Sequence, residues 1–331
     1  MPSLPRPRLR RPARSRDLSV APEPESQTPK VEVLEADGLR WLHIERPRAI
    51  DRSYLEEHFD FHPLDYEDLF SRNQRPKVDT YDDYLFVVLH FPVFDKTVGR
   101  LNASELDIFV GPDYLITLPN SELPPLEYLF ERVRTRDDLR EDIFSKGPGY
   151  LLYRIVDDLV DASFPMLRKI GNKLERLEDS IFEGESEKIV RDISDTKQEI
   201  ITFRKIVRPQ RAALADLERT KRYIPEDLEI YFDDINDAGE RIWDMLENFK
   251  EVIEGIEDTN ESIVQHRLND TFRILTVISV VFLPLTLIAS IWGMNSHVPG
   301  EQSVEGFWLV VAIMVVVLAG MLGFFKKRGW L

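Results

Sequence analysis

Two uninterrupted apolar runs stand near the C-terminal end of the chain, at residues 274–292 and 307–325. Neither contains a charged residue, and each approaches the roughly 20 residues that a helix needs to cross the hydrocarbon core of a bilayer. A short polar loop separates them. The pattern therefore predicts a membrane hairpin, with a first transmembrane helix at residues 271–292 and a second at residues 307–325.

The region before the hairpin has a helical period. From Tyr150 onward, apolar residues recur at spacings of three and four, as in an amphipathic helix. The pattern predicts a helix from Tyr150 that ends before Gly184, a second over about 187–217, and a third beginning at Pro225. No cluster of turn residues stops the third helix before Trp292, so it is predicted to enter the membrane uninterrupted. A helix of this length would extend on the order of 100 Å.

Residues 29–145 show shorter runs of a different kind. Tyr84–Phe91 and Leu106–Leu118 are rich in β-forming residues, and a Gly-Pro-Asp turn breaks the second run. An aromatic-rich helical pattern over Tyr54–Phe70 precedes them. We therefore expect an α/β cytoplasmic domain over residues 29–145, followed by a stalk of long helices over residues 146–270.

Charge is distributed unevenly along the chain. The net charge is −16, yet residues 1–16 hold six Arg and no acid, and residues 271–331 hold four Lys or Arg against two Glu. Residues 17–270 therefore carry −24. So acidic a domain repels nucleic acid and attracts cations, although each carboxylate taken singly could serve solubility alone. Residues 1–28 are predicted to be a disordered Arg/Pro-rich tail, because they lack the apolar stretch of a secretory signal.

The flanking charges predict the orientation of the hairpin. The loop over residues 293–306 has no Lys or Arg and carries two Glu, whereas residues 326–331 are basic. By the positive-inside rule, both termini are cytoplasmic and the loop faces outward.

A polar stripe runs along the third predicted helix. Counting back from Gly293 by alternating steps of three and four residues gives Gly293, Ser290, Thr286, Leu283, Ser279, Thr276, Phe272, Asn269, Gln265, Ser262 and Asp258. Four of the five Ser and Thr residues between 271 and 292 lie on this stripe. Its mean period of about 3.5 is that of a seam in a left-handed helix bundle.

Two interpretations of the stripe are open. Small hydroxyl residues can let membrane helices pack closely while bonding their own backbone. Alternatively, the stripe is the wall of a water-filled pore, which is favoured because it continues beyond the membrane run to Asp258. One helix cannot enclose a pore, so this interpretation predicts a homo-oligomer around a symmetry axis.

Several motifs in a fixed order carry a family resemblance. Gly293-Met294-Asn295 follows the first apolar run directly, and the second run ends at Lys326-Lys327. The other motifs are His62-Pro63-Leu64 with Glu67-Asp68, Gln74-Arg75-Pro76-Lys77 with Tyr81 and Tyr84-Leu85-Phe86, Tyr150-Leu151-Leu152-Tyr153, Tyr231-Phe232 with Asp234, and Phe282-Leu283-Pro284-Leu285-Thr286. From roughly residue 30 to the end, the chain resembles the CorA family of divalent-cation channels.

The resemblance implies a homopentamer in the plasma (inner) membrane of a prokaryote. Its partners are further copies of the chain, membrane lipid and divalent cations, with Mg²⁺ both as cargo and as regulator. No enzyme activity, organic cofactor or nucleic-acid partner is expected. In agreement, the chain has no GxxxxGK[ST] or GxGxxG loop, and its six His show no metal-ligand spacing.

The resemblance also implies roles for individual residues. Asn295 would form a ring of amides at the outer mouth, after a turn made by Gly293 and Met294. Amide oxygens suit Mg²⁺, which sheds its water shell reluctantly. The alternative role of Asn295 is a helix C-cap. The remaining lumen positions are the lining residues Thr286, Ser279, Thr276 and Asn269, the apolar constrictions Leu283 and Phe272, and the cation-attracting Asp258. Phe272 departs from the unbranched Met expected at that constriction.

The resemblance further implies that Glu67, Asp68 and Asp234 form a cytoplasmic Mg²⁺ sensor between neighbouring subunits. Ordinary solvated carboxylates are the alternative for all three. Two other functions stay open beside a gated Mg²⁺ channel: a zinc or cobalt/nickel transporter of the same superfamily, and a membrane-anchored cation sensor without transport. Met294 favours magnesium over zinc, and the polar stripe favours transport over simple anchoring.

Overall fold

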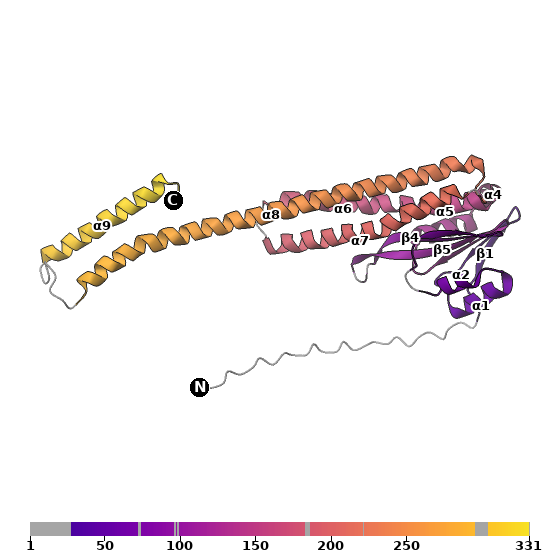
Figure 1. Cartoon of the computed structure of the whole chain (residues 1–331), viewed down its shortest axis with the longest axis horizontal. Coiled ribbons are helices and arrows are strands. Elements are labelled where there is room, and N and C mark those ends of the chain that lie inside the picture. Colours follow the sequence, from indigo (N-terminus) through magenta and orange to yellow (C-terminus); the bar gives the residue numbers. More distant parts are fainter. Residues whose placement is uncertain are drawn as a thin grey trace, which may run out of the picture. The chain divides into compact units, whose positions relative to one another are not determined.

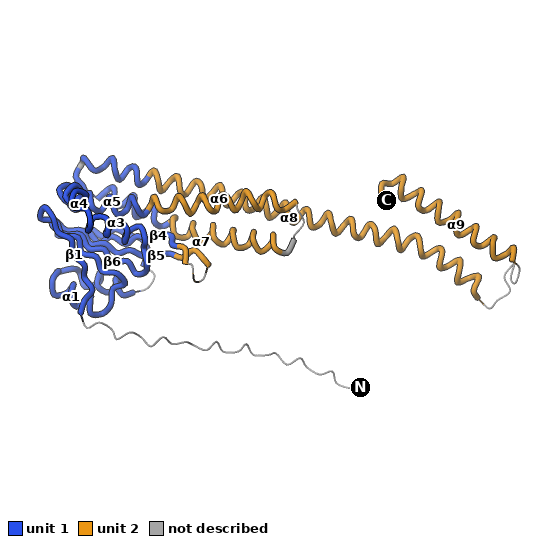
Figure 2. Tube along the Cα trace, turned by 180° about the vertical axis from the view of Figure 1, so that it is seen from behind, with its two compact units in different colours: residues 1–93, 103–159, 209–236 blue, residues 94–102, 160–208, 237–331 orange. Residues whose placement is uncertain are grey.

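The computed structural model describes residues 28–71, 74–95, 97, 99–182, 186–220, 222–294 and 304–330. These residues form two compact units, each built from segments distant in sequence (Figure 2). Unit 1 consists of the described parts of residues 1–93, 103–159 and 209–236, and unit 2 of those of residues 94–102, 160–208 and 237–331. The linear domain boundaries expected from the sequence stay predictions.

Unit 1 is built on a six-stranded sheet of order β1-β2-β6-β5-β4-β3. The strands are β1 Glu32–Ala36, β2 Leu39–His43, β3 Lys77–Thr80, β4 Leu85–Asp95, β5 Arg100–Val110 and β6 Tyr114–Pro119. Strands β2 and β6 pair in parallel, whereas β1 with β2, β3 with β4 and β5 with β6 pair antiparallel. The expected turn between β5 and β6 is confirmed. At its start, a Cβ on Gly111 would lie 2.3 Å from the Tyr114 ring, so a larger residue would have to displace that ring.

Unit 1 contains the following helices (Figure 1): α1 Ala49–His58, α2 Pro63–Asp68, α3 Pro124–Thr135, α4 Asp137–Phe144 and most of α5 Pro148–Asp161. The single helix predicted over Tyr54–Phe70 is wrong, because the chain is extended at Phe59 and His62 between α1 and α2. Pro63 explains the break. Proline disfavours helical backbone at the preceding residue and is well placed in a first helical turn.

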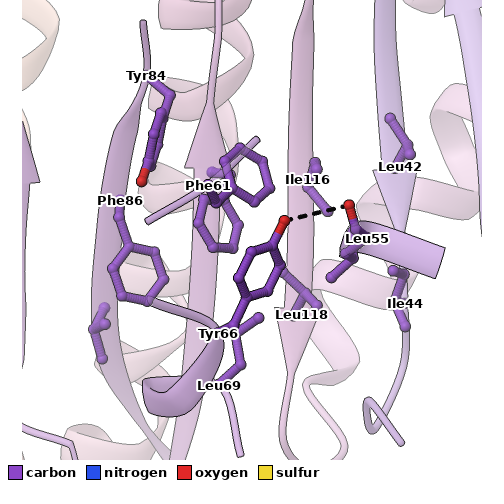
Figure 3. Packing of buried hydrophobic residues seen from close by; sticks show 12 residues of the cluster. Leu42, Ile44, Leu55, Phe61, Tyr66, Leu69, Tyr84, Phe86, Ile116 and Leu118 are labelled. Atoms are coloured by element: carbon purple, nitrogen blue, oxygen red, sulfur yellow. Dashed lines mark hydrogen bonds between the residues drawn. The ribbon is translucent and has the colours of Figure 1, made fainter. Parts of the chain in front are cut away.

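A compact aromatic and aliphatic core joins α1 and α2 to the sheet (Figure 3). Its buried members are Leu42, Ile44, Leu55, Phe61, Tyr66, Leu69, Tyr84, Phe86, Val88, Phe109, Ile116 and Leu118. The Phe61 and Phe109 rings stack with centroids 4.0 Å apart. The Tyr66 hydroxyl donates a hydrogen bond to the Leu55 carbonyl at 3.3 Å, so the buried tyrosine oxygen has a partner. This packing fixes α2 against the sheet.

Unit 2 contains α6 Ser163–Ser180 and α9 Val304–Lys327, together with most of α7 Ser186–Arg219 and α8 Glu229–Trp292. A 3₁₀ turn, η1 Glu226–Leu228, precedes α8, which then runs without interruption for 64 residues, or about 100 Å. The predicted entry of one long helix into the first apolar run is thus confirmed. Both α8 and α9 include stretches long and apolar enough to cross a membrane by length and composition.

The helix predicted from Tyr150 toward Gly184 is in fact two helices, α5 and α6, separated by Ala162. Pro165 lies in the first turn of α6 and has no N–H with which to bond the Asp161 carbonyl. The helical period continues through this break because α5 and α6 both bury an apolar face. The apolar pattern therefore predicted both segments as helical but not the break between them.

One buried carboxyl in unit 1 is unusual. Asp107, on the central strand β5, is 2% exposed, and its Oδ1 has no hydrogen-bond partner in the part of the chain that the structure describes. Burial raises the pKa of the Asp107 carboxyl well above its ordinary value, and the charge of Glu105 acts in the same direction. The structure therefore favours the protonated form of Asp107.

The raised pKa of Asp107 predicts a pH dependence of stability. The stabilisation of the protonated acid is complete below its ordinary pKa and is lost as pH rises toward the raised value, at about 1.4 kcal/mol per pH unit. Asp107→Asn removes this titration. Between about pH 5 and about pH 8, the thermal unfolding midpoint of the full-length variant in detergent should therefore fall less steeply than that of the wild type. The exposed Asp82→Asn is the control, and a variant curve parallel to the wild-type curve would contradict the assignment.

Candidate functional site

The apolar helices α8 and α9 contact each other along one face of α8. Val277 and Val281 of α8 are buried against Phe325 of α9. Leu285, Leu318 and Met321 pack around these three residues and are partly buried. Helix α9 turns back alongside α8 (Figure 1), so this contact defines which face of α8 is covered within the chain.

The polar stripe lies on the opposite face of α8. A helix turns by about 100° per residue, so Ser279 and Leu283, two positions to either side of Val281, lie about 160° from it around the axis. The stripe residues of the apolar segment are all exposed in the single chain: Phe272, Thr276, Ser279, Leu283, Thr286 and Ser290. Leu283 is 68% exposed and Phe272 is 62% exposed. Helix α9 therefore leaves the whole stripe uncovered.

Three hydroxyl groups of the stripe donate their hydrogens to their own helix. The Thr276, Ser279 and Thr286 hydroxyls bond the carbonyls four residues earlier at 2.7, 2.8 and 2.9 Å. A hydroxyl has one hydrogen and two lone pairs, so each oxygen presents acceptor capacity away from the helix. The bonds themselves are common to a packing seam and to a pore wall. An acceptor-rich surface, however, suits cations better than anions.

The polar residues below the apolar segment are likewise on the surface of this chain. Asp258 and Asn269 are exposed, and the Ser262 hydroxyl donates to the Asp258 carbonyl at 3.0 Å. At the other end of α8, the Gly293 N–H bonds the Ala289 carbonyl at 2.9 Å, and Met294 is 59% exposed. Asn295 and the loop up to residue 303 lie outside the described residues, so the amide ring stays a prediction.

The expected sensor residues Glu67 and Asp68 line a cavity of about 520 Å³ in unit 1. Its lining residues are Leu64, Asp65, Glu67, Asp68, Lys77, Asp79, Thr80 and Tyr81. Glu67 is exposed and Asp68 is half-buried at the end of α2. Asp234, on α8, is exposed and does not line this cavity.

The Asp68 carboxylate already has partners within the chain. Its Oδ1 accepts a hydrogen bond from Gln74 Nε2 at 2.9 Å, and its Oδ2 lies 2.8 Å from Lys77 Nζ. The same ammonium lies 2.5 Å from Asp79 Oδ2. Burial lowers the pKa of Lys77, but its hydrogen bonds to Asp68 and Asp79 outweigh this and raise the pKa overall. Lys77 is therefore firmly charged.

Asp65 anchors the wall of the same cavity. The Tyr84 and Tyr81 hydroxyls donate to its two carboxylate oxygens at 2.7 and 2.9 Å. Burial raises the pKa of Asp65, and the two tyrosine bonds partly offset the rise. Burial and the bond to Asp65 in turn raise the pKa of Tyr81 to about 12. These bonds fix α2 on the sheet and hold Asp68 beside β3.

Sequence reasoning missed Lys77 and Asp79 as members of this site. Lys77 stood in a recognised motif, but no role followed from the motif alone. Alternation along β3 was the available signal, because residues 77 and 79 project to the same face of a strand. Their approach to Asp68, however, depends on where α2 packs.

The donor chemistry of the proposed sensor fits a hard divalent cation. Glu67, Asp68 and Asp234 supply carboxylate oxygens, which Mg²⁺ prefers, and an ionised carboxylate has about four lone-pair sites, so Asp68 keeps acceptor capacity. Within the described part of one chain, no group of three or more His, Cys, Asp or Glu residues is placed to hold a metal ion.

Comparisons with known proteins agree with this architecture. The family model described as CorA-like Mg²⁺ transporter protein matches residues 36–327. The cobalt/magnesium transport protein CorA of Thermotoga maritima is 31% identical over 318 residues, covering 95% of this chain and 86% of the relative. The solved structure of the CorA magnesium transporter from Methanocaldococcus jannaschii has a TM-score of 0.79 at 24% identity, covering 90% of this chain and 93% of that chain.

The match thus extends from Ala36, the last residue of β1, to Lys327, the last residue of α9, and includes both apolar helices. Members of the matched family are transporters and channels, which confirms that the chain is not an enzyme. The α/β unit, the long helix and the apolar hairpin are all parts of the matched fold. The chain belongs to the CorA-like Mg²⁺ transporter family of divalent-cation transporters.

Proposed function

We propose that this chain assembles as a homopentamer into a gated Mg²⁺ channel in the plasma membrane of a prokaryote, with both termini in the cytoplasm. One observation carries the proposal: the stripe of α8 lies on the face opposite its contact with α9. In a ring of five copies, this arrangement lets α9 face lipid while the stripe faces the axis. The exposed apolar side chains of α9 then have a hydrocarbon environment, and the hydroxyl oxygens have water or cations.

The charges of the chain support inward attraction of cations. Residues 17–270 carry −24, and Asp258 lies on the stripe below the apolar segment. Clefts lined by one sign of charge concentrate ions of the opposite sign. The chain has no GxxxxGK[ST] or GxGxxG loop, and we assign the driving force to the electrochemical gradient of the cation.

Selection is assigned to Asn295 at the outer mouth. Five side-chain amides could bind the hydrated ion through their oxygens without stripping its water shell. Carboxylates at this position would bind the cation more tightly and slow its release. Gly293 and Met294 end α8 directly before this residue, and the backbone bond from Gly293 to Ala289 closes the last helical turn.

The first transport prediction concerns this mouth. Asn295→Ala removes one amide oxygen per subunit and leaves the apolar packing of α8 and α9 untouched, so Mg²⁺ flux into proteoliposomes should be abolished while assembly persists. Flux is measured with a Mg²⁺-sensitive dye and assembly by light scattering in detergent. Asn269→Ala, which is also on the stripe but below the apolar segment, is the comparison and should retain measurable flux. Wild-type flux in Asn295→Ala would refute the assignment. In the wild type, the degree to which Co²⁺, Ni²⁺ or Zn²⁺ reduces Mg²⁺ flux identifies the preferred ion.

Gating is assigned to Leu283 and Phe272. Both are large apolar residues on an otherwise polar stripe, and both are exposed in the single chain. A ring of five such side chains can close a pore by excluding water, without a physical plug. Movement of α8 would change the radius of each ring, since α8 is one uninterrupted helix.

Single cysteines distinguish a pore wall from a packing seam, because the chain has no native Cys. Cysteine at Thr276, Ser279, Leu283, Thr286 or Ser290 should react with small water-soluble thiol reagents, and the reaction should block flux. Cysteine at Val277, Val281 or Leu285, on the α9-facing side, should react slowly and leave flux unchanged. Equal reactivity of the two sets of cysteines, measured by mass spectrometry, would show that the stripe is a packing seam and not a pore wall.

Regulation is assigned to Glu67 and Asp68 of one subunit together with Asp234 of a neighbouring subunit. These carboxylates repel one another across the interface when no cation lies between them. A bridging Mg²⁺ supplies the positive charge that cancels this repulsion, so a filled site holds the closed arrangement and an empty site releases it.

The sensor assignment predicts Mg²⁺-dependent protection. Limited proteolysis of the full-length wild type should be slow in millimolar Mg²⁺ and fast after chelation, because ligand binding stabilises the closed state. The double variant Asp68→Lys, Asp234→Lys replaces two metal ligands by ammonium groups at the metal site, so its protection should become independent of Mg²⁺. Flux should also persist at internal Mg²⁺ concentrations that silence the wild type. Unchanged Mg²⁺ dependence in both assays would show that these acids are ordinary surface charge.

A further inference from the structure

Lys77 lies between two carboxylates in the cavity beside α2. Its ammonium is 2.8 Å from Asp68 Oδ2 and 2.5 Å from Asp79 Oδ2. The lysine side chain is 31% exposed and the Asp68 side chain is 22% exposed, so solvent screens this pair less than a surface pair. An internal cation thus already pairs with the carboxylate that the sensor needs.

The position of this ammonium is set by the sheet. Lys77 stands opposite Val88 in the antiparallel pairing of β3 with β4, and its Nζ lies 5.2 Å from the centre of the Phe86 ring. On the other side of Asp68, Gln74 Nε2 fixes the second oxygen at 2.9 Å. Backbone pairing, an aromatic face and two carboxylates therefore hold Lys77 in one place, unlike a freely moving surface lysine.

We propose that Lys77 is a tethered counter-cation that competes with Mg²⁺ for Asp68 and so sets the Mg²⁺ concentration at which the sensor fills. The inference rests on the proposed function of Glu67, Asp68 and Asp234. A divalent ion that binds Asp68 must share the carboxylate with the ammonium or displace it. Either event costs free energy, because the ammonium and Mg²⁺ repel each other at short distance.

A purely structural role makes a different prediction. If Lys77 only ties β3 to the end of α2, its removal loosens the cavity and Mg²⁺ affinity falls or stays constant. If Lys77 competes, its removal frees an oxygen of Asp68 and the affinity rises. The direction of the change therefore separates the two roles.

The experiment titrates MgCl₂ against full-length protein in detergent at constant ionic strength and measures the midpoint of protection from limited proteolysis. For Lys77→Met, the midpoint should fall on the order of tenfold, which corresponds to the roughly 1.4 kcal/mol typical of one lost charged interaction. Lys77→Gln keeps a hydrogen-bond donor but removes the charge, and should shift the midpoint in the same direction. Lys77→Arg keeps the charge and should stay near the wild type.

Lys146→Met is the matched control for the loss of one positive charge. Lys146 also pairs with a carboxylate, Asp142, at 2.9 Å, and also lies over an aromatic ring, that of Tyr150, at 4.4 Å. It does not line the cavity beside α2. Its loss changes the general electrostatic attraction without freeing Asp68, so its midpoint should move far less than that of Lys77→Met.

The outcomes separate this inference from the function on which it rests. A wild type without any Mg²⁺-dependent protection overturns the sensor and the role of Lys77 together. A Mg²⁺-dependent wild type in which Lys77→Met and Lys77→Gln match Lys146→Met overturns the role of Lys77 alone. If Lys77→Met fails to fold, Lys77→Gln decides, because its amide keeps a polar hydrogen-bond donor at this position. Lower midpoints for the neutral variants, with Lys77→Arg unchanged, support the competition.

Discussion

The hydrogen-bond ladder of α8 is the constraint on which the rest of the structure depends. In hydrocarbon, a backbone amide or carbonyl has no water to bond, so a membrane-crossing segment must satisfy these groups within itself. Helix α8 does so over 64 residues, including its apolar segment, and several of its hydroxyl groups also bond its own carbonyls. Residues of α8 belong to both compact units, so one uninterrupted helix contributes to the α/β unit and to the apolar hairpin.

The two faces of α8 near its end follow from this ladder. With the backbone satisfied internally, side chains alone decide what each face contacts. Branched apolar residues such as Val277 and Val281 pack against α9, while hydroxyl oxygens and two large apolar residues lie on the other face. A hydroxyl whose hydrogen is already bonded to a backbone carbonyl presents only its lone pairs to the surroundings. The chemistry of the exposed face thus follows from the bonding of the helix itself.

Three carboxyls of the α/β unit are stabilised in different ways. Tyr81 and Tyr84 donate two hydroxyl bonds to Asp65, and Lys77 pairs with Asp68. Asp107 Oδ1 has no hydrogen-bond partner among the described residues, and burial favours the protonated form of this acid. Of these three, only Asp68 has a partner that another cation could replace, and it is itself one of the residues assigned to the sensor. The hydrogen-bond or ion-pair partner of each carboxyl therefore says more about its role than the net charge of the unit does.

The sequence by itself determined the elements whose signal is local. Two charge-free runs predicted the apolar hairpin, and a period of three and four without turn residues predicted the uninterrupted α8, because hydropathy and helical spacing are properties of neighbouring residues. Motif order identified the family for the same reason.

The local pattern did not predict two helix breaks, at Pro63 and before Pro165. At both places the apolar period continues through the break, because the segments on either side both bury an apolar face. Only the tertiary structure decided which face of α8 contacts α9, that Asp107 is buried with its Oδ1 unpartnered among the described residues, and that Lys77 lies between Asp68 and Asp79. Each of these depends on which separate elements pack together, and no spacing along the chain records that.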